Sequence, residues 1–186
     1  MTAQLRHPPG KYKLTVDDFL RLDETGVFGT TRTELIDGDI IIMNAEYRPH
    51  GRIRDELHFR LRRALEDMGS ELLPLSASVA LMDHSMPLPD IVLTDEPYGD
   101  GPIPLGSIAL IVEVSASTLH RDTNEKLSMY ASARVPEYWA VDVSGRKIIC
   151  WSAPNGSAFE SHTEIMFGGP ITCVTIPGLT IATDAL

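Results

Sequence analysis

Three residues in the middle of the chain have the types and spacing that a metal-dependent hydrolase needs. Asp90 begins one predicted strand, Glu113 ends the next central strand, and Lys126 lies on the helix that follows. If the two strands are antiparallel neighbours, the first residue of one lies opposite the last residue of the other, and both side chains share a face. We therefore expect the carboxylates of Asp90 and Glu113 to lie close together.

Two neighbouring carboxylates repel each other, and a divalent cation removes that penalty. Carboxylate oxygens suit Mg²⁺ or Mn²⁺. Glu113 also lies in a nearly all-apolar segment, 108–114, so its buried charge needs a metal, a cationic partner or a raised pKa. Lys126 can provide the cation, and a purely structural Glu113–Lys126 ion pair is the alternative to a catalytic role.

Short motifs around these residues resemble the PD-(D/E)XK nuclease signature, in which a Pro-Asp strand and an Asp/Glu-x-Lys strand hold one or two divalent metals. The chain has Pro89-Asp90 and Glu113-Val114-Ser115. Ser115 stands where the signature has lysine, and Lys126 on the next helix would restore the missing charge.

A longer series of motifs resembles the Uma2 family of restriction-endonuclease-like bacterial proteins, in order over nearly the whole chain. The motifs are Glu34-Leu35-Ile36-Asp37-Gly38-Asp39, His50, Pro89-Asp90-Ile91-Val92, Glu113-Val114-Ser115 with Ser117-Thr118, Asp122-x-x-x-Lys126-x-x-x-Tyr130 and Glu137-Tyr138-Trp139-x-Val141-Asp142.

This resemblance implies a restriction-endonuclease-like fold and a metal-dependent phosphodiesterase site. Asp90 and Glu113 would be ligands of Mg²⁺ or Mn²⁺, and the metal would activate the attacking water. Lys126 would stabilise negative charge on the phosphate or orient that water. The expected substrate is DNA, with RNA as an alternative, and a homodimer is expected because two DNA strands need two sites.

Two further residues are candidates for the same site. Glu34 resembles the acidic residue that some nucleases of this class contribute from their first elements; alternatively, it is a solvated strand residue. His50 falls on the apolar face of a predicted helix, where it is either a satisfied core histidine or a contact of the scissile phosphate or of a ligand carboxylate. Asp122 is interpreted as the N-cap of the last helix, with Glu125 as its reciprocal partner.

The charge balance excludes a generally basic nucleic-acid coat protein. The 186 residues include 26 acidic and 16 Lys or Arg side chains, for a net charge of -10. A nuclease is still compatible, because the local field around a site governs its binding. Arg52, Arg60 and Arg63 share one flank of a predicted helix and form either a phosphate-tracking stripe or a solvated face with an Arg–Glu pair.

Other features of the sequence bear on the class of protein and on its location. The net charge and Ser115 also favour a non-catalytic binding or assembly module that keeps the nuclease fold. No long apolar run and no apolar N-terminal stretch occur, so we expect a cytoplasmic protein without a membrane partner. Cys150 and Cys173 are expected to be reduced and partly buried.

Hydrophobic periodicity and turn residues predict an α+β fold with a restriction-endonuclease-like mixed sheet flanked by helices. A flexible arm over residues 1–12 would precede a single domain over 13–186. The predicted helices cover 15–22, 50–68 and 123–134. The predicted strands are a hairpin over 33–43, then 76–82, 89–94 and 108–114, a hairpin of 137–143 and 146–151, and finally 159–166 and 171–176, with a loop over 95–106.

Overall fold

The computed structural model describes residues 10–186, and a six-stranded mixed sheet forms the centre of this part of the chain. The spatial order of its strands is β10-β9-β8-β7-β5-β3. They are β3 (Leu73–Leu75), β5 (Ile91–Thr94), β7 (Ile108–Ser115), β8 (Glu137–Asp142), β9 (Lys147–Asn155) and β10 (Ala158–Met166). β7 and β8 are parallel, whereas the other neighbours are antiparallel.

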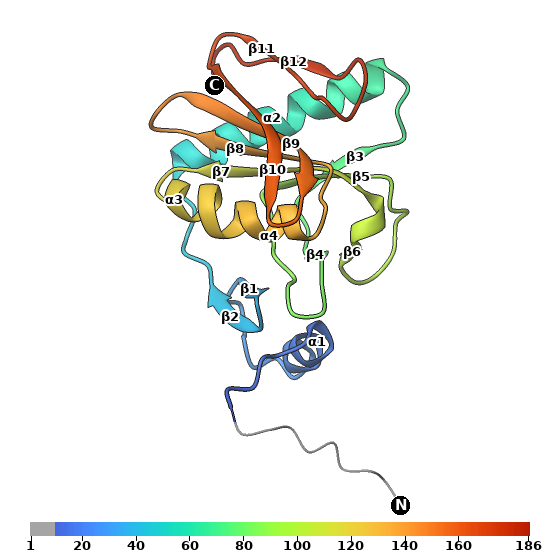
Figure 1. Ribbon diagram of the computed structural model, residues 1–186, viewed down its shortest axis with the longest axis vertical. Coiled ribbons are helices and arrows are strands. Elements are labelled where there is room, and N and C mark those ends of the chain that lie inside the picture. The colour runs from blue at the N-terminus through green and yellow to red at the C-terminus, as the bar shows by residue number, and fades with distance from the viewer. Residues whose placement is uncertain (1–9) are drawn as a thin grey trace, which may run out of the picture.

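Helices cover both faces of this sheet (Figure 1). On one face lies α2 (Arg48–Asp67), together with the short strands β11 (Pro170–Thr172) and β12 (Thr180–Ala182). On the other face lie α3 (Leu119–Arg121), a π-helical turn over Asp122–Lys126, and α4 (Leu127–Ser132). This arrangement confirms the predicted α+β class.

The long helix α2 is held by the apolar stripe that the sequence predicts. Ile53, Leu57, Leu61 and Leu65 are all buried in the core that α2 shares with the sheet. Their spacing of four residues places them on one face of a helix of 3.6 residues per turn. This packing fixes the first turn of α2, which carries His50, at the end of the sheet near β5.

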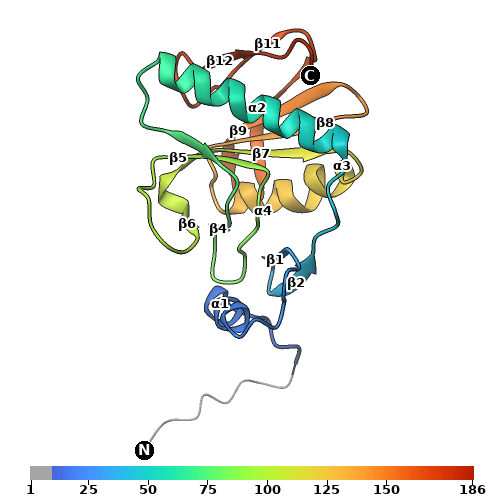
Figure 2. The same ribbon diagram turned by 180° about the vertical axis from the view of Figure 1, so that it is seen from behind.

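A smaller unit at the N-terminal side combines α1 (Val16–Glu24) with the hairpin of β1 (Thr33–Ile36) and β2 (Asp39–Ile42) (Figure 2). Thr15 and Asp18 form the predicted capping box. The hairpin turns at Asp37 and Gly38, which both have positive φ angles, of 47° and 75°. Phe19 and Leu35 pack with Met86 in a separate small core, which ties this unit to the segment before β5.

Two segments between α2 and β7 differ from the prediction. The predicted strand over 76–82 contains only β4 (Val79–Ala80), which pairs with β6 (Ile103–Pro104) outside the central sheet. The predicted loop over 95–106 therefore contains a short strand, and a 3₁₀ turn follows at Leu105–Ser107. Proline and glycine made this segment resemble a loop, although its backbone still pairs with β4.

The prediction that Asp122 caps the last helix is wrong. The helix already begins at Leu119, and Asp122 lies within it as the first residue of the π-helical turn. Its carboxylate accepts hydrogen bonds from the hydroxyls of Ser115 (2.7 Å) and Thr118 (2.6 Å) rather than from the helix backbone. Glu125 forms an ion pair with Arg121 instead of closing a capping box.

Other expectations concern the N-terminal arm, a membrane span and the two cysteines. Of the predicted N-terminal arm over 1–12, residues 1–9 lie outside the described residues. No helix within residues 10–186 is both long and apolar enough to cross a membrane. Cys150 and Cys173 are free thiols, and both are buried rather than partly buried as expected.

A buried carboxylate, that of Glu137, connects β8 to the segment between β11 and β12. It accepts hydrogen bonds from the indole of Trp139 (2.7 Å), the backbone N–H of Thr175 (2.8 Å), the Thr175 hydroxyl (2.9 Å) and the Cys173 thiol (3.0 Å). Glu137 is fully buried. Removing it would leave several donors without a partner in the protein interior.

We predict that Glu137→Ala lowers the free energy of unfolding by about 3 kcal/mol, because buried donors lose their acceptor. Guanidinium chloride unfolding measures this change. The matched control is Glu164→Ala, which removes a half-exposed carboxylate 2.9 Å from Lys147 on the same sheet and should cost less than ~1 kcal/mol. Equal losses in the two variants would contradict the role assigned to Glu137.

Candidate metal-binding and catalytic site

The site begins with the pairing of β5 and β7. These strands are antiparallel, with Ile91 opposite Val112, so the residue before β5, Asp90, lies opposite Glu113. The strand arrangement expected from the sequence is therefore confirmed. A carboxylate oxygen of Asp90 also accepts a hydrogen bond of 2.7 Å from the backbone N–H of Val114. Asp90 and Glu113 line one cavity of about 160 Å³.

Lys126 reaches this cavity from the π-helical turn. Its Nζ lies 2.8 Å from Oε1 of Glu113 and 3.3 Å from Oε2 of Glu34. The hydroxyl of Tyr130, one turn further on, donates to the same Glu113 oxygen at 2.6 Å. Lys126 is only 3% exposed and Glu34 is 0% exposed, so this ionic group is shielded from water. Glu34, Glu113 and Lys126 thus meet from β1, β7 and the π-helical turn.

Burial makes Glu113 hard to ionise. Burial raises the pKa of Glu113 to about 8, because the attraction of Lys126 only partly offsets desolvation, and Asp90 and Asp122 add repulsion. Burial also disfavours the charged form of Lys126, but Glu113 and Glu34 outweigh it and raise the pKa of the ammonium. Lys126 is therefore charged, and the surrounding acids are short of positive charge.

Glu34 is not the solvated strand residue that the sequence allowed as an alternative. Besides Lys126, its carboxylate binds the guanidinium of Arg121 at 2.6 Å and accepts a hydrogen bond of 3.4 Å from the backbone N–H of Leu88. Arg121 lines the same cavity but was missed by sequence analysis. It lies in a polar stretch without apolar periodicity, so only the docking of β1 against the helix reveals it.

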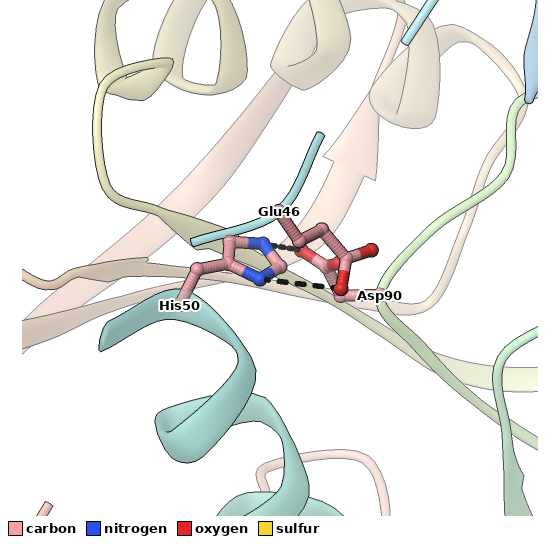
Figure 3. A group of neighbouring side chains, drawn as sticks. All are labelled: Glu46, His50 and Asp90. Carbon is pink, nitrogen blue, oxygen red and sulfur yellow. Dashed lines mark hydrogen bonds and ion pairs between the residues drawn. The ribbon is translucent and has the colours of Figure 1, made fainter. Parts of the chain in front are cut away.

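His50 contacts a candidate ligand carboxylate, which is one of the roles expected for it. Its Nε2 lies 3.2 Å from Oδ2 of Asp90, and its Nδ1 lies 3.9 Å from Oε2 of Glu46. Figure 3 shows the two carboxylates on the same side of the imidazole, each joined to one ring nitrogen by a dashed line. The hydrogen bond with Asp90 raises the pKa of His50. Nδ1 is buried and, within residues 10–186, has no hydrogen-bond partner.

Glu46 was also missed by sequence analysis. It lies in the short loop between β2 and α2, and its carboxylate is bound by the guanidinium groups of both Arg32 and Arg54. Burial disfavours ionisation of Glu46, but the two arginines reverse this effect and lower its pKa. Arg32 precedes β1, Glu46 lies in a loop and Arg54 lies on α2, so no periodic pattern connects these three residues.

Two sets of side chains around Asp90 have the chemistry to hold a divalent metal. Glu46, His50 and Asp90 offer ligand atoms within 4.8 Å of one another, but the two arginines bound to Glu46 oppose a cation there. The second set is Asp90 and Glu113. In the described residues, the hydrogen bonds to these two carboxylates use Oδ2 of Asp90 and Oε1 of Glu113, which leaves the other oxygen of each for a metal. Hard oxygen ligands in a cation-deficient cavity fit Mg²⁺ or Mn²⁺. Asp90 is common to both sets.

The predicted arginine stripe faces a different part of the protein. Arg60 pairs with Glu56 at 2.8 Å and donates to the backbone carbonyl of Ala182 at 2.6 Å. Arg52 and Arg63 line cavities bordered by C-terminal residues of the chain rather than by Asp90. Arg60 therefore makes the Arg–Glu pair that was the alternative interpretation of the stripe.

Comparison with known proteins identifies the family and a similar fold. The model of the Uma2 family, described as "Putative restriction endonuclease", matches residues 16–184. The chain belongs to the Uma2 family. A solved structure with a similar fold is described as "a putative nuclease belonging to DUF820 from Anabaena variabilis ATCC 29413". It has 17% sequence identity and a TM-score of 0.63, with coverage of 88% of this Uma2 chain and 89% of that one. No curated protein matches this Uma2 sequence.

We predict that Lys126→Met destabilises the protein by about 3 to 5 kcal/mol, because the buried carboxylate of Glu113 loses its cation and that of Glu34 keeps only Arg121. Urea unfolding measures this loss. Adding Glu113→Gln to Lys126→Met should recover part of it, since one uncompensated charge is removed. If the double variant is as unstable as the sum of the two single variants, Lys126 and Glu113 are not coupled as described.

Proposed function

We propose that this protein is a divalent-metal-dependent nuclease that hydrolyses phosphodiester bonds in DNA. The observation that supports it best is the placement of Asp90 opposite Glu113 in one cavity, with the Lys126 ammonium 2.8 Å from Glu113. Membership of the Uma2 family supports the same reaction class. Carboxylates that hold a metal beside a fixed positive charge are suited to phosphodiester hydrolysis, in which negative charge develops on phosphate oxygens.

In this proposal Asp90 and Glu113 hold Mg²⁺ or Mn²⁺, which supplies a Lewis acid and an activated water when bound. The backbone N–H of Val114 and the His50 imidazole fix the orientation of Asp90. Partners that orient a metal ligand in this way strengthen its binding. Tyr130 has the same role for Glu113.

The positive charge of the site comes from two side chains that Glu34 positions. Its two oxygens bind Lys126 and Arg121 separately, so both cations are kept at the wall of the cavity. We propose that Lys126 stabilises negative charge on the scissile phosphate or orients the attacking water. Ser115 occupies the position where the nuclease signature has lysine, and its hydroxyl donates to the carboxylate of Asp122. In this proposal Lys126, from the helix, supplies the positive charge instead.

A non-catalytic binding or assembly module is the second candidate function. It is favoured by the binding of Lys126 to two carboxylates at once, which is the arrangement of a structural ion pair. Isothermal titration with Mn²⁺ separates the two functions. A nuclease site should bind the ion in the wild type and lose it in Glu113→Gln, whereas a module should give no heat in either protein.

Assembly and substrate contacts complete the proposal. Cutting both strands of a duplex needs two sites, so we propose a homodimer, which sedimentation velocity tests.

The stripe of Arg52, Arg60 and Arg63 lies outside the Asp90 cavity, so we propose that it contributes to general attraction of nucleic acid rather than to contact with the scissile phosphate.

We predict that the protein nicks or linearises supercoiled plasmid DNA in the presence of Mg²⁺ or Mn²⁺ and that EDTA abolishes this activity. Asp90→Asn and Glu113→Gln should each lower the cleavage rate by at least about a hundredfold, because the metal loses a charged ligand. Agarose gel electrophoresis measures the rates.

The matched control is Asp23→Asn, which removes an exposed carboxylate from α1, outside the cavity, and should leave the rate unchanged. An RNA substrate in the same assay tests the alternative substrate class. Absence of cleavage with either metal, or undiminished cleavage by Asp90→Asn, would refute the proposed reaction.

A further inference from the structure

The carboxylate of Glu46 is held by two arginines directly beside the candidate site. Arg32 lies just before β1, Arg54 lies one turn after His50 on α2, and both guanidinium groups bind Glu46. Arg54 also binds Asp55 at 3.0 Å. Glu46 is part of the wall of the cavity that contains Asp90, Glu113 and Lys126. The two arginines therefore surround an anion at the edge of the site.

A second cavity, of about 440 Å³, adjoins Asp90. Arg32, Arg54 and His58 line it together with Asp55, Ser76 and Asp90. The two cavities thus share Asp90, and the guanidinium groups of Arg32 and Arg54 line only the second one. An extended polyanion with one phosphate near Asp90 would pass its neighbouring phosphate along this arginine-lined wall.

We propose that Arg32 and Arg54 form a subsite for a phosphate of the DNA backbone, and that Glu46 occupies this subsite when DNA is absent. The proposal rests on the proposed nuclease function for the identity of the polyanion. Guanidinium groups bind carboxylate and phosphate oxygens through the same planar arrangement of N–H donors. A glutamate held between two arginines therefore takes the place that a phosphate would take.

The position of Glu46 allows this exchange. It lies in the loop over residues 43–47, whose residues other than Met43 are exposed, and the Glu46 side chain is 24% exposed. Displacing it requires no rearrangement of the core, because none of its partners is a buried apolar residue. Its ionised form, favoured by the two arginines, competes with DNA for the same donors.

The experiment measures binding without cleavage. A fluorescein-labelled 20-base-pair DNA duplex is titrated with the full chain in EDTA, and fluorescence anisotropy gives the Kd. We expect Glu46→Gln to bind about tenfold more tightly than the wild type, because two guanidinium groups become available to phosphate. Arg32→Gln and Arg54→Gln should each weaken binding of the wild type.

The matched control is Glu66→Gln, which changes the net charge equally. Glu66 pairs with Arg62 at 2.6 Å on the last turns of α2, away from both cavities. It should leave the Kd within about twofold of the wild type, as expected for an exposed ion pair. Equal effects of Glu46→Gln and Glu66→Gln would overturn the proposal, since the gain would then reflect net charge alone.

The salt dependence of binding provides a readout that a structural role of the arginines would not alter. In the Glu46→Gln background, adding Arg54→Gln should reduce the slope of log Kd against log salt concentration by about one, because one phosphate contact is lost. An unchanged slope would overturn the subsite. Binding of single-stranded RNA in preference to the duplex, with the same response to Glu46→Gln, would overturn its assignment to DNA.

These outcomes are separate from those of the cleavage assay. If no DNA is cut but Glu46→Gln specifically tightens binding, the subsite is supported and the catalytic proposal fails. If DNA is cut but binding does not respond to Glu46 or to the two arginines, the nuclease is supported and the subsite fails.

Discussion

The structure of the site depends on one buried ammonium group, that of Lys126. An isolated charge in a protein interior is very costly, so it persists only when opposite charges complete its surroundings. Glu34 and Glu113 supply those charges from β1 and β7. The hairpin, the central strand and the π-helical turn must therefore all be in place at once. Loss of any one of them would leave an uncompensated charge between the sheet and the helix.

The buried ammonium of Lys126 also explains why the carboxylates of the site are not fully compensated by positive charge. Five carboxylates, those of Glu34, Glu46, Asp90, Glu113 and Asp122, line the cavity with Lys126 and Arg121. Because Lys126 is shared by Glu34 and Glu113, it compensates neither fully, and burial keeps the pKa of Glu113 raised. A divalent cation beside Asp90 would complete the balance. Glu46, in the wall of the same cavity, has the opposite surroundings, since two arginines bind it.

Much of this site could be predicted from the sequence because it follows from local rules. The alternation of side chains in two antiparallel strands places Asp90 opposite Glu113, and the helix after β7 returns Lys126 towards the same face. The apolar stripe of α2 likewise indicated that its first turn, with His50, would lie against the sheet. These features depend on periodicity within single elements or on neighbouring strands.

The features that sequence analysis missed depend on contacts between different elements rather than on periodicity within one element. The burial of Glu34 results from the docking of the β1–β2 hairpin against the helix that carries Arg121, and periodicity within a strand does not predict docking. Arg32, Glu46 and Arg54 meet through a loop. Asp122 had the sequence position of a helix cap, but the hydroxyls of Ser115 and Thr118 offered its carboxylate better partners inside the fold.

The most direct test of this account is a crystal of the protein soaked in Mn²⁺, with anomalous diffraction recorded near the manganese absorption edge. The account predicts an anomalous peak within coordination distance of the carboxylates of both Asp90 and Glu113. A peak held only by Glu46 and His50, or a cavity that binds no manganese at millimolar concentration, would contradict it.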